Sequence, residues 1–398
     1  MKIQYKEKII EIQEERSIQE ILSEEIKNNE YAVVGAIFNN EYENLNYKIH
    51  ENGKLELIDI SSKEGSKIYR RTMVYILAKA FEKLYPNNKM NVNYQLTNSM
   101  FCDVENIDVT EEMVHNISEE MRRIIKQDLP IKQIVMNRQE AEEFYKKYDT
   151  SKGRLQLDLE DNQKIYMYEC DGYYNYCYGT IANRTGIAKI FEIVKYGNGL
   201  LMRYPSSDKP QQLPKLVDSK KLAWALDEYE DIHRILNMDR VYKINNAIGD
   251  DRIKDVIMLD EALHEKKIAN IADEIAKNRS IKMILIAGPS SSGKTTFAQR
   301  LGLQLRINKL RPVTISVDNY FVERKDNPKD ENGNYDFECI EAIDMKLFND
   351  HLTKLLNGEE IEMPEFDFYE GTKKYKGKKL KLGKEDVLVI EGIHCLND

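Results

Sequence analysis

The chain has 398 residues, of which 41% are hydrophobic and 32% charged, and a net charge of −9. It is long enough for two or three domains with sizeable cores. No apolar run approaches the roughly 20 residues that span a bilayer, and the N-terminus has no signal-peptide core. The negative charge argues against nonspecific binding to nucleic acid. The five scattered cysteines have no C-x-x-C spacing, which favours a reducing, cytoplasmic setting over a disulfide or zinc framework.

Residues 1–62 predict a small α/β unit. The Ser17-Ile-Gln-Glu20 segment is a capping box that opens an amphipathic helix, and Asn39-Asn40 is a plausible turn. The expected elements are strands at Ile3–Ile12, Tyr31–Phe38 and Leu55–Ile60 and a helix at Ile18–Lys27. This alternation indicates a β-grasp domain, which binds a partner but catalyses nothing by itself.

Residues 63–215 predict an α+β domain. A strand-rich tract runs from Leu155 to Arg203, and its tyrosines are typical either of half-buried sheet faces or of an aromatic platform for bases. These tyrosines are Tyr166, Tyr168, Tyr173, Tyr174, Tyr176 and Tyr178. The expected helices are Lys67–Leu84, Glu111–Gln127 and Asn137–Tyr148. Ser206–Pro214 is the linker candidate, and helices at Ser219–Leu236 and Leu259–Lys277 follow in a connector, residues 216–280.

A phosphate-binding loop follows the connector. The apolar run Ile281–Ala287 predicts a buried parallel strand, and Thr295–Gln304 predicts the start of a helix. Between them the glycines let successive backbone N–H groups face phosphate oxygens, and the helix dipole adds positive charge there. Lys294 can reach the β- and γ-phosphates, and the Thr295 hydroxyl can hold Mg²⁺. The expected nucleotide-binding residues are Gly288, Pro289, Ser290, Ser291, Ser292, Gly293, Lys294, Thr295 and Thr296.

Two acidic residues follow later strands of the same domain. Asp318 ends the run Pro312–Val317, where it would lie at the ligand-binding edge of a parallel sheet and accept a proton from an attacking hydroxyl. The alternative is an N-cap for the next turn. Glu391 ends the run Val387–Ile390 and is placed to hold Mg²⁺ directly or through water. The lysine-rich run Lys373–Lys384 predicts a solvated hairpin or, as the alternative, a nucleic-acid patch.

Five motifs in order resemble the uridine kinase branch of the uridine kinase/phosphoribulokinase family. They are GPSSSGKTT, SVDNYF, NYDF…AID (Asn334–Asp344), LLNGEEIEMPEFDF and VLVIEGIHCLN. The resemblance implies a P-loop kinase that uses Mg²⁺ with ATP or GTP, with Asp318 as the base for a ribose 5′-hydroxyl. It also implies that Asp336 binds the ribose hydroxyls and that Phe321 and Phe366 line the nucleoside pocket. Gly371 stands where such kinases place a base-recognising histidine, so the resemblance implies a 5′-hydroxyl acceptor and leaves the base open.

The front half resembles threonyl-tRNA synthetases. Residues 1–62 resemble their TGS domain, while Glu64–Pro86 and Tyr168–Gly186 resemble the editing domain that follows it. In the synthetases two histidines, a cysteine and a further histidine surround the editing site. Here Arg71 and Tyr75 replace the first pair, Ile181 replaces the last histidine, and Cys177 alone remains. Since one thiol cannot assemble a metal or hydrolytic site, we expect no editing activity.

The fold class expected overall is a multidomain α/β chain with the division 1–62, 63–215, 216–280 and 281–398. Because the sequence ends just after the third predicted kinase strand, we expect that parallel sheet to be truncated at its C-terminus. The leading function is ATP- or GTP-dependent phosphorylation of a nucleoside such as uridine or cytidine. The alternative is a nucleotide-sensing or RNA-binding regulator with a vestigial kinase domain. We also expect a homo-oligomer, RNA contact through residues 1–215 and no membrane partner.

Overall fold

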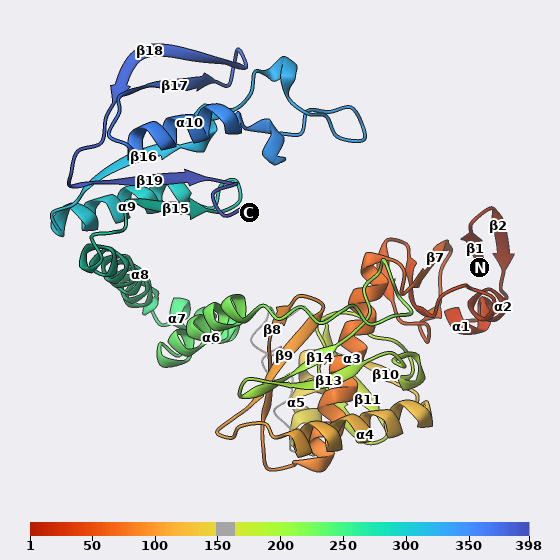
Figure 1. The fold of residues 1–398 in the computed structure, drawn as a ribbon. Coiled ribbons are helices and arrows are strands. Elements are labelled where there is room, and N and C mark those ends of the chain that lie inside the picture. The colour runs from red at the N-terminus through yellow and green to blue at the C-terminus, as the bar shows by residue number, and fades with distance from the viewer. Residues whose placement is uncertain (149–163, 398) are drawn as a thin grey trace. The chain divides into compact units, whose positions relative to one another are not determined.

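The computed structural model describes residues 1–148 and 164–397. The chain forms two compact units, Met1–Asn246 and Ala247–Asp398, drawn in red to green and in green to blue in Figure 1. The finer fourfold division stays a prediction. The first part of the predicted strand tract, 155–163, lies outside the described residues. Within the described part of the chain, no helix combines the length and apolarity needed to cross a bilayer.

The N-terminal segment is a five-stranded sheet in the order β2-β1-β7-β4-β5, with β1 and β7 parallel. The Ser17–Glu20 capping box is confirmed. Two expectations differ: the tract from Ile3 is a hairpin that turns at Lys6, and the helix is divided at the fully buried Leu22. The elements are β1 (Lys2–Tyr5), β2 (Lys8–Glu11), β3 (Arg16–Ser17), α1 (Ile18–Ile21), α2 (Ser23–Lys27), β4 (Val33–Phe38), β5 (Glu41–Glu43), β6 (Lys48–Ile49) and β7 (Gly53–Asp59).

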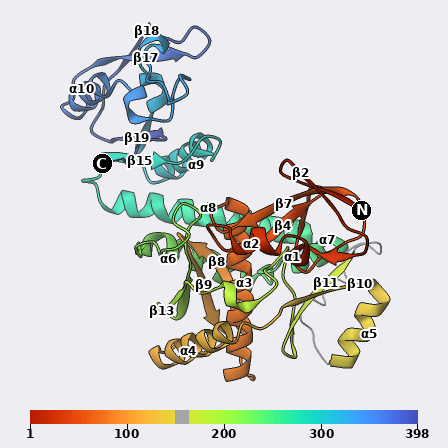
Figure 2. The ribbon, with the colours of Figure 1, turned by 90° about the vertical axis from the view of Figure 1, so that its right-hand side faces the viewer.

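The rest of the first unit is built on a four-stranded sheet in the order β13-β14-β9-β8. Helices α3 (Lys63–Leu84) and α4 (Glu111–Gln127) share one apolar core with it, and Figure 2 shows both helices beside the sheet. A second sheet has the order β10-β11-β12. The remaining elements are β8 (Met90–Leu96), β9 (Ser99–Val104), β10 (Lys132–Met136), α5 (Arg138–Tyr148), β11 (Ile165–Cys170), β12 (Tyr173–Asn175), η2 (Thr185–Ile187), β13 (Glu192–Tyr196) and β14 (Gly199–Arg203).

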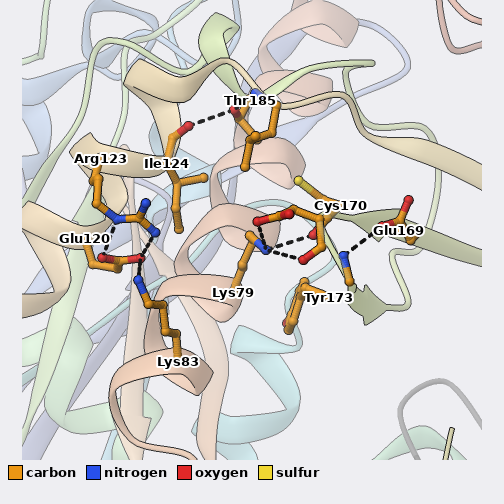
Figure 3. Close-up of polar contacts among 12 residues, drawn as sticks. Lys79, Lys83, Glu120, Arg123, Ile124, Glu169, Cys170, Tyr173 and Thr185 are labelled. Atoms are coloured by element: carbon orange, nitrogen blue, oxygen red, sulfur yellow. Dashed lines mark hydrogen bonds and ion pairs between the residues drawn. The ribbon is translucent and has the colours of Figure 1, made fainter.

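Polar contacts join α3 to its neighbours, as Figure 3 shows. The Glu120 carboxylate on α4 accepts hydrogen bonds from Arg123 Nη2 at 2.6 Å and from Lys83 Nζ at 2.9 Å. The hydrogen bonds from Arg123 and Lys83 lower the pKa of Glu120 to about 2. On the other side, Lys79 Nζ donates to the Cys170 carbonyl at 2.8 Å. These charged contacts fix the orientation of α3 between α4 and β11.

Two further helices follow, α6 (Lys220–Ile235) and α7 (Val241–Gly249), of which the sequence predicted only the first; the boundary between the two units falls within α7, after Asn246. The Tyr94 hydroxyl donates to Asp227 at 2.6 Å, and Arg234 donates to Asp103 at 2.5 Å. These bonds attach α6 to β8 and β9.

The second unit has a parallel sheet in the order β15-β19-β16. The strand that comes last in sequence therefore lies between the other two, and all of its residues are buried. Val387 and Val389 pack toward α8 and α9, whereas Leu388 and Ile390 pack toward α10 and β17. This alternation is the strand period of two, and Figure 1 shows α9 and α10 on opposite faces of the sheet.

The bounds in this unit differ from expectation at two places. Helix α8 begins six residues before the predicted Leu259, at Ile253. The lysine-rich run lies in one strand, β18, as far as Leu380 and pairs with β17, so this hairpin turns at 368–371 and not inside the run. The elements are α8 (Ile253–Lys277), β15 (Met283–Ala287), α9 (Lys294–Ile307), β16 (Arg311–Ser316), η3 (Val317–Tyr320), η4 (Arg324–Asp326), η5 (Ile340–Ala342), α10 (Met345–Leu356), β17 (Ile361–Asp367), β18 (Thr372–Leu380) and β19 (Asp386–Gly392).

Candidate active site

The phosphate-binding loop joins β15 to α9, as the sequence predicted. Ser291 and Gly293 have left-handed φ values of 61° and 85°, which bend the backbone into a concave loop. A Cβ at Gly288 would lie 2.6 Å from Ser292 Oγ, so a larger residue there would require the Ser292 hydroxyl to rotate away. Pro289, Ser290, Ser291 and Ser292 are exposed, and their backbone is accessible to a ligand.

Helix α9 begins with the two residues assigned to phosphate and metal. Lys294 Nζ donates to the Pro289 carbonyl at 3.1 Å, which holds the ammonium over the loop. The Thr295 hydroxyl donates to Glu391 Oε1 at 3.4 Å. Thr296 is exposed on the same turn and lines, with Lys294, a cavity of about 510 Å³ beside the loop.

The Thr295 hydroxyl and the Glu391 carboxylate fit a magnesium ion that is bound together with a nucleotide. Both ligands are oxygens, and Glu391 is almost fully buried at the end of the central strand. Among the described residues no group of three acidic, histidine or cysteine side chains forms a metal cage. Mg²⁺ typically uses one or two protein oxygens and takes its other ligands from phosphates and water.

Asp318 lies in η3, directly after β16, and is half-buried. Burial and the neighbouring charge of Glu391 raise the pKa of Asp318, while Lys294 and His394 act in the opposite direction. The structure therefore brings Asp318, Glu391 and Lys294 from three separate motifs to one end of the sheet. A raised pKa makes a carboxylate a stronger proton acceptor.

Phenylalanine rings form a cluster next to Asp318. The centroids of the Phe321 and Phe366 rings lie 5.6 Å apart, and both side chains are buried. Phe337 and Phe368, which close the NYDF and PEFDF motifs, lie 6.2 and 6.0 Å from Phe321 and are partly exposed. Asp336 is half-buried beside this cluster, and its Oδ1 accepts the Glu338 N–H at 2.9 Å.

Arg324 is a site residue that sequence reasoning missed. Its guanidinium donates to the carbonyls of Phe368 at 2.5 Å and Tyr369 at 3.3 Å. Gly371 has φ +72°, and a Cβ there would lie 2.7 Å from Arg324 Cβ. The position of the expected base-recognising histidine is therefore closed to any side chain, because Arg324 fills the space. No local pattern around Arg324 indicates this contact.

His394 was also missed, although it follows Glu391 by only three residues. Its Nδ1 lies 3.0 Å from Asn397 Nδ2. Its Nε2 is buried and has no hydrogen-bond partner in the part of the chain that the structure describes. Its charge acts on Asp318, so it belongs to the same electrostatic environment.

In the front half, the predicted editing positions hold a buried tyrosine. The Tyr75 hydroxyl donates to the carbonyls of Tyr168 at 3.2 Å and Tyr173 at 3.1 Å. Ile181 is fully buried in the same cluster, and burial raises the pKa of the Cys177 thiol to about 12. A thiol that stays protonated at neutral pH is a poor nucleophile; the absence of editing activity stays a prediction.

The fold and the loop define the second unit as a P-loop kinase domain. Residues 283–398 match the sequence model of the Phosphoribulokinase / Uridine kinase family. Two solved structures are similar to about a third of the chain. A possible uridine kinase from Bacillus stearothermophilus has 23% identity and a TM-score of 0.28, and the match covers 32% of this chain and 70% of that chain. D-glycerate 3-kinase from Cryptococcus neoformans has 20% identity and a TM-score of 0.24, and the match covers 33% of this chain and 52% of that chain.

The N-terminal region matches threonyl-tRNA synthetases. It is similar to the threonine–tRNA ligases of Fusobacterium nucleatum, at 28% identity over 163 residues, and Thermotoga maritima, at 31% over 165 residues. Each alignment covers 40% of this chain and 26% of the relative. The chain therefore spans about a quarter of the length of these two curated relatives, and it joins a synthetase-like region to a P-loop kinase domain.

Proposed function

We propose that the chain is a nucleoside kinase that transfers the γ-phosphoryl group of ATP or GTP to the 5′-hydroxyl of a uridine- or cytidine-like nucleoside. One observation carries this proposal: Asp318 shares its electrostatic environment with the loop lysine Lys294 and with Glu391, and it lies three residues before Phe321 in the aromatic cluster. The charge interaction with Lys294 and the closeness to Phe321 in sequence support a role for Asp318 as the proton acceptor between a bound phosphate and a bound ring.

In this proposal each side chain has one task. Lys294 and the loop N–H groups hold the β- and γ-phosphates, and Thr295 with Glu391 would hold Mg²⁺. Bound Mg²⁺ supplies neutralising charge for the phosphate oxygens. Asp318 accepts the proton of the 5′-hydroxyl while the oxygen of that hydroxyl forms a bond to the γ-phosphorus. The bond from the γ-phosphorus to the β,γ-bridging oxygen breaks, and the nucleoside diphosphate of the donor leaves.

The acceptor is held by the rings and by Asp336. Phe321 and Phe366 present aromatic surface for a base, and the Asp336 carboxylate is proposed to accept the ribose hydroxyls. Because Gly371 has no side chain, the base must be recognised by other groups at the 368–371 turn. The carbonyls of Phe368 and Tyr369 in this turn are bound by Arg324, so that residue is a candidate for contact with the proposed base.

The test is release of ADP by the full-length protein with a panel of nucleosides, each compared with its 5′-deoxy analogue. The proposal expects turnover with uridine or cytidine and none with the 5′-deoxy compounds. The Asp326→Asn variant, an exposed carboxylate of η4, should keep full turnover, whereas Asp318→Asn should lose it. Turnover that does not depend on a nucleoside 5′-hydroxyl would refute the proposal.

A second candidate function, an RNA-binding regulator, is favoured by a different observation. Arg122, Lys126 and Lys189 line a cavity of about 440 Å³ in the front unit, and cations grouped in this way suit phosphates. This candidate expects tRNA binding that weakens in the Lys126→Glu variant, together with nucleotide binding but no nucleoside-dependent turnover. Assembly as a homo-oligomer stays part of both proposals, to be measured by light scattering.

A further inference from the structure

A second cavity, separate from the kinase site, lies within the front unit. It has a volume of about 390 Å³, which is in the range of small-molecule sites, about 300–1,000 Å³. Strand β5 of the five-stranded sheet forms one wall, and β10, β11 and the loop 176–180 form the others. Six tyrosines line it: Tyr42, Tyr47, Tyr166, Tyr168, Tyr176 and Tyr178.

Hydrogen bonds between the walls keep this tyrosine pocket open in a defined shape. The Thr180 hydroxyl donates to the Tyr42 carbonyl at 2.9 Å, and Asn44 Nδ2 donates to the Ile181 carbonyl at 2.8 Å. The Tyr168 hydroxyl donates to the Gly179 carbonyl at 3.2 Å. A ligand would therefore enter a preformed site and lose little free energy to reordering of the protein.

The charged groups of the pocket are two carboxylates and one lysine. Glu43 is half-buried, and Glu41 and Lys164 are exposed at the rim. Within residues 1–148 and 164–397, no hydrogen bond or ion pair joins the side chain of Glu43 to another residue. Burial, and then the charge of Glu41, raises the pKa of Glu43 to about 7. A carboxylate in such surroundings gains most from a ligand that carries positive charge.

We propose that the tyrosine pocket binds a small organic cation, with Glu43 as its counter-ion and the tyrosine rings as its walls. Aromatic rings attract ammonium groups through the negative potential of their faces, and cages of this composition suit alkylated ammonium ions. Free phosphates and nucleotides are disfavoured, because both Glu41 and Glu43 repel them. This site goes beyond the proposed kinase function and does not depend on it.

The first test compares choline with 3,3-dimethylbutan-1-ol, its neutral isostere, by saturation-transfer NMR and calorimetry on the full-length protein. We expect choline to bind at least about ten-fold more tightly than the isostere, since the shape is shared and only the cation differs. The Glu43→Gln variant should lose about the same factor, while Glu24→Gln, an exposed carboxylate of α2, should bind as the unmodified protein does. No choline binding, equal binding of the isostere, or unchanged binding in Glu43→Gln would overturn the proposal.

Lys164 provides a second, independent test. Its ammonium lines the pocket and its charge acts on Glu43, so it competes with an incoming cation for the same carboxylate. Lys164→Ala should therefore tighten choline binding several-fold, whereas a site for anions would be weakened by the same change. Circular dichroism and the melting temperature would show that the Glu43→Gln and Lys164→Ala variants fold.

The pH dependence should follow the same carboxylate. A cation requires ionised Glu43, so choline affinity should rise between pH 6 and 8 and binding should release protons near pH 7, since the pKa of Glu43 is about 7. The titratable and charged groups that face Glu43 are Glu41, His50, Lys164, Tyr47 and Tyr168. The charge of His50 lowers the pKa of Glu43, so the dependence must persist in His50→Gln and shrink in Glu43→Gln; the reverse result would contradict the assignment.

Discussion

Gly371 offers the sharpest test of how the acceptor side of the kinase domain is built. An alanine there must adopt φ +72°, which costs about 1–2 kcal/mol for a residue with a Cβ. The new Cβ would also lie 2.7 Å from Arg324 Cβ, an overlap that no side-chain rotation relieves. Overpacking of this kind typically costs a further 1–3 kcal/mol, so Gly371→Ala should lower the free energy of unfolding by about 2–5 kcal/mol.

Gly358 is the matched control for this substitution. It has φ +78° after α10, and nothing lies within 4 Å of a Cβ built there. Gly358→Ala should therefore show the backbone cost of about 1–2 kcal/mol alone. The difference in unfolding free energy between the two variants isolates the overlap with Arg324. Arg324→Gly removes that Cβ, so combining it with Gly371→Ala should restore most of this difference.

The assay is urea unfolding of each variant, followed by nucleoside and nucleotide kinetics. Because the 368–371 turn carries Phe368, whose ring lies 6.0 Å from Phe321, Gly371→Ala should raise KM for the nucleoside more than KM for the nucleotide. Equal destabilisation by the two glycine substitutions would refute the reasoning, since both share the backbone cost and only one has the overlap.

Three further predictions concern charge and buried hydrogen bonds. Because the pKa of Asp318 is raised, the acid limb of the pH profile of kcat should lie at a higher pH than for an ordinary aspartate. His394→Gln removes a charge that lowers the pKa of Asp318, so it should move the acid limb to a still higher pH. Asp318→Asn should lower kcat about 10²–10⁴-fold. The pKa of folded Glu120 is depressed to about 2 from 4.5, so its stabilisation is complete above pH 4.5 and is lost as the pH falls toward 2; Glu120→Gln should cost about 1–3 kcal/mol at pH 7. Tyr75→Phe should cost about 1–3 kcal/mol, because it leaves buried carbonyls, that of Tyr168 among them, without their donor.

Each of these has a control in the chain. Asp326→Asn should leave the pH profile in place, and Glu119→Gln, at an exposed ion pair, should change stability by less than about 0.5 kcal/mol. Tyr178, which is 85% exposed, should tolerate phenylalanine without loss. A flat pH profile for the unmodified enzyme, an acid titration of unfolding unchanged in Glu120→Gln, or a neutral Tyr75→Phe would contradict the corresponding argument.

Local sequence patterns predicted the elements that carry the chemistry. The α4 helix has the predicted bounds, Glu111–Gln127, because its apolar spacing is regular; the structure adds that the Thr110 side chain caps it. The glycine loop was recognised because its backbone demands are local. Prediction was weaker where burial of one residue overrode the helical period, as at Leu22, which is enclosed in the core and divides α1 from α2.

The amino-acid sequence alone therefore determined that the chain has a phosphate-binding loop, two acids at strand ends and a synthetase-like front region. Packing of distant segments decided that β19 lies in the middle of the kinase sheet, that Thr295 meets Glu391 across 96 positions and that Arg324 occupies the space beside Gly371. The physical reason is the range of the information. Backbone preference and hydrophobic period are properties of neighbouring residues, whereas a contact between residues tens of positions apart depends on which surfaces exclude water together.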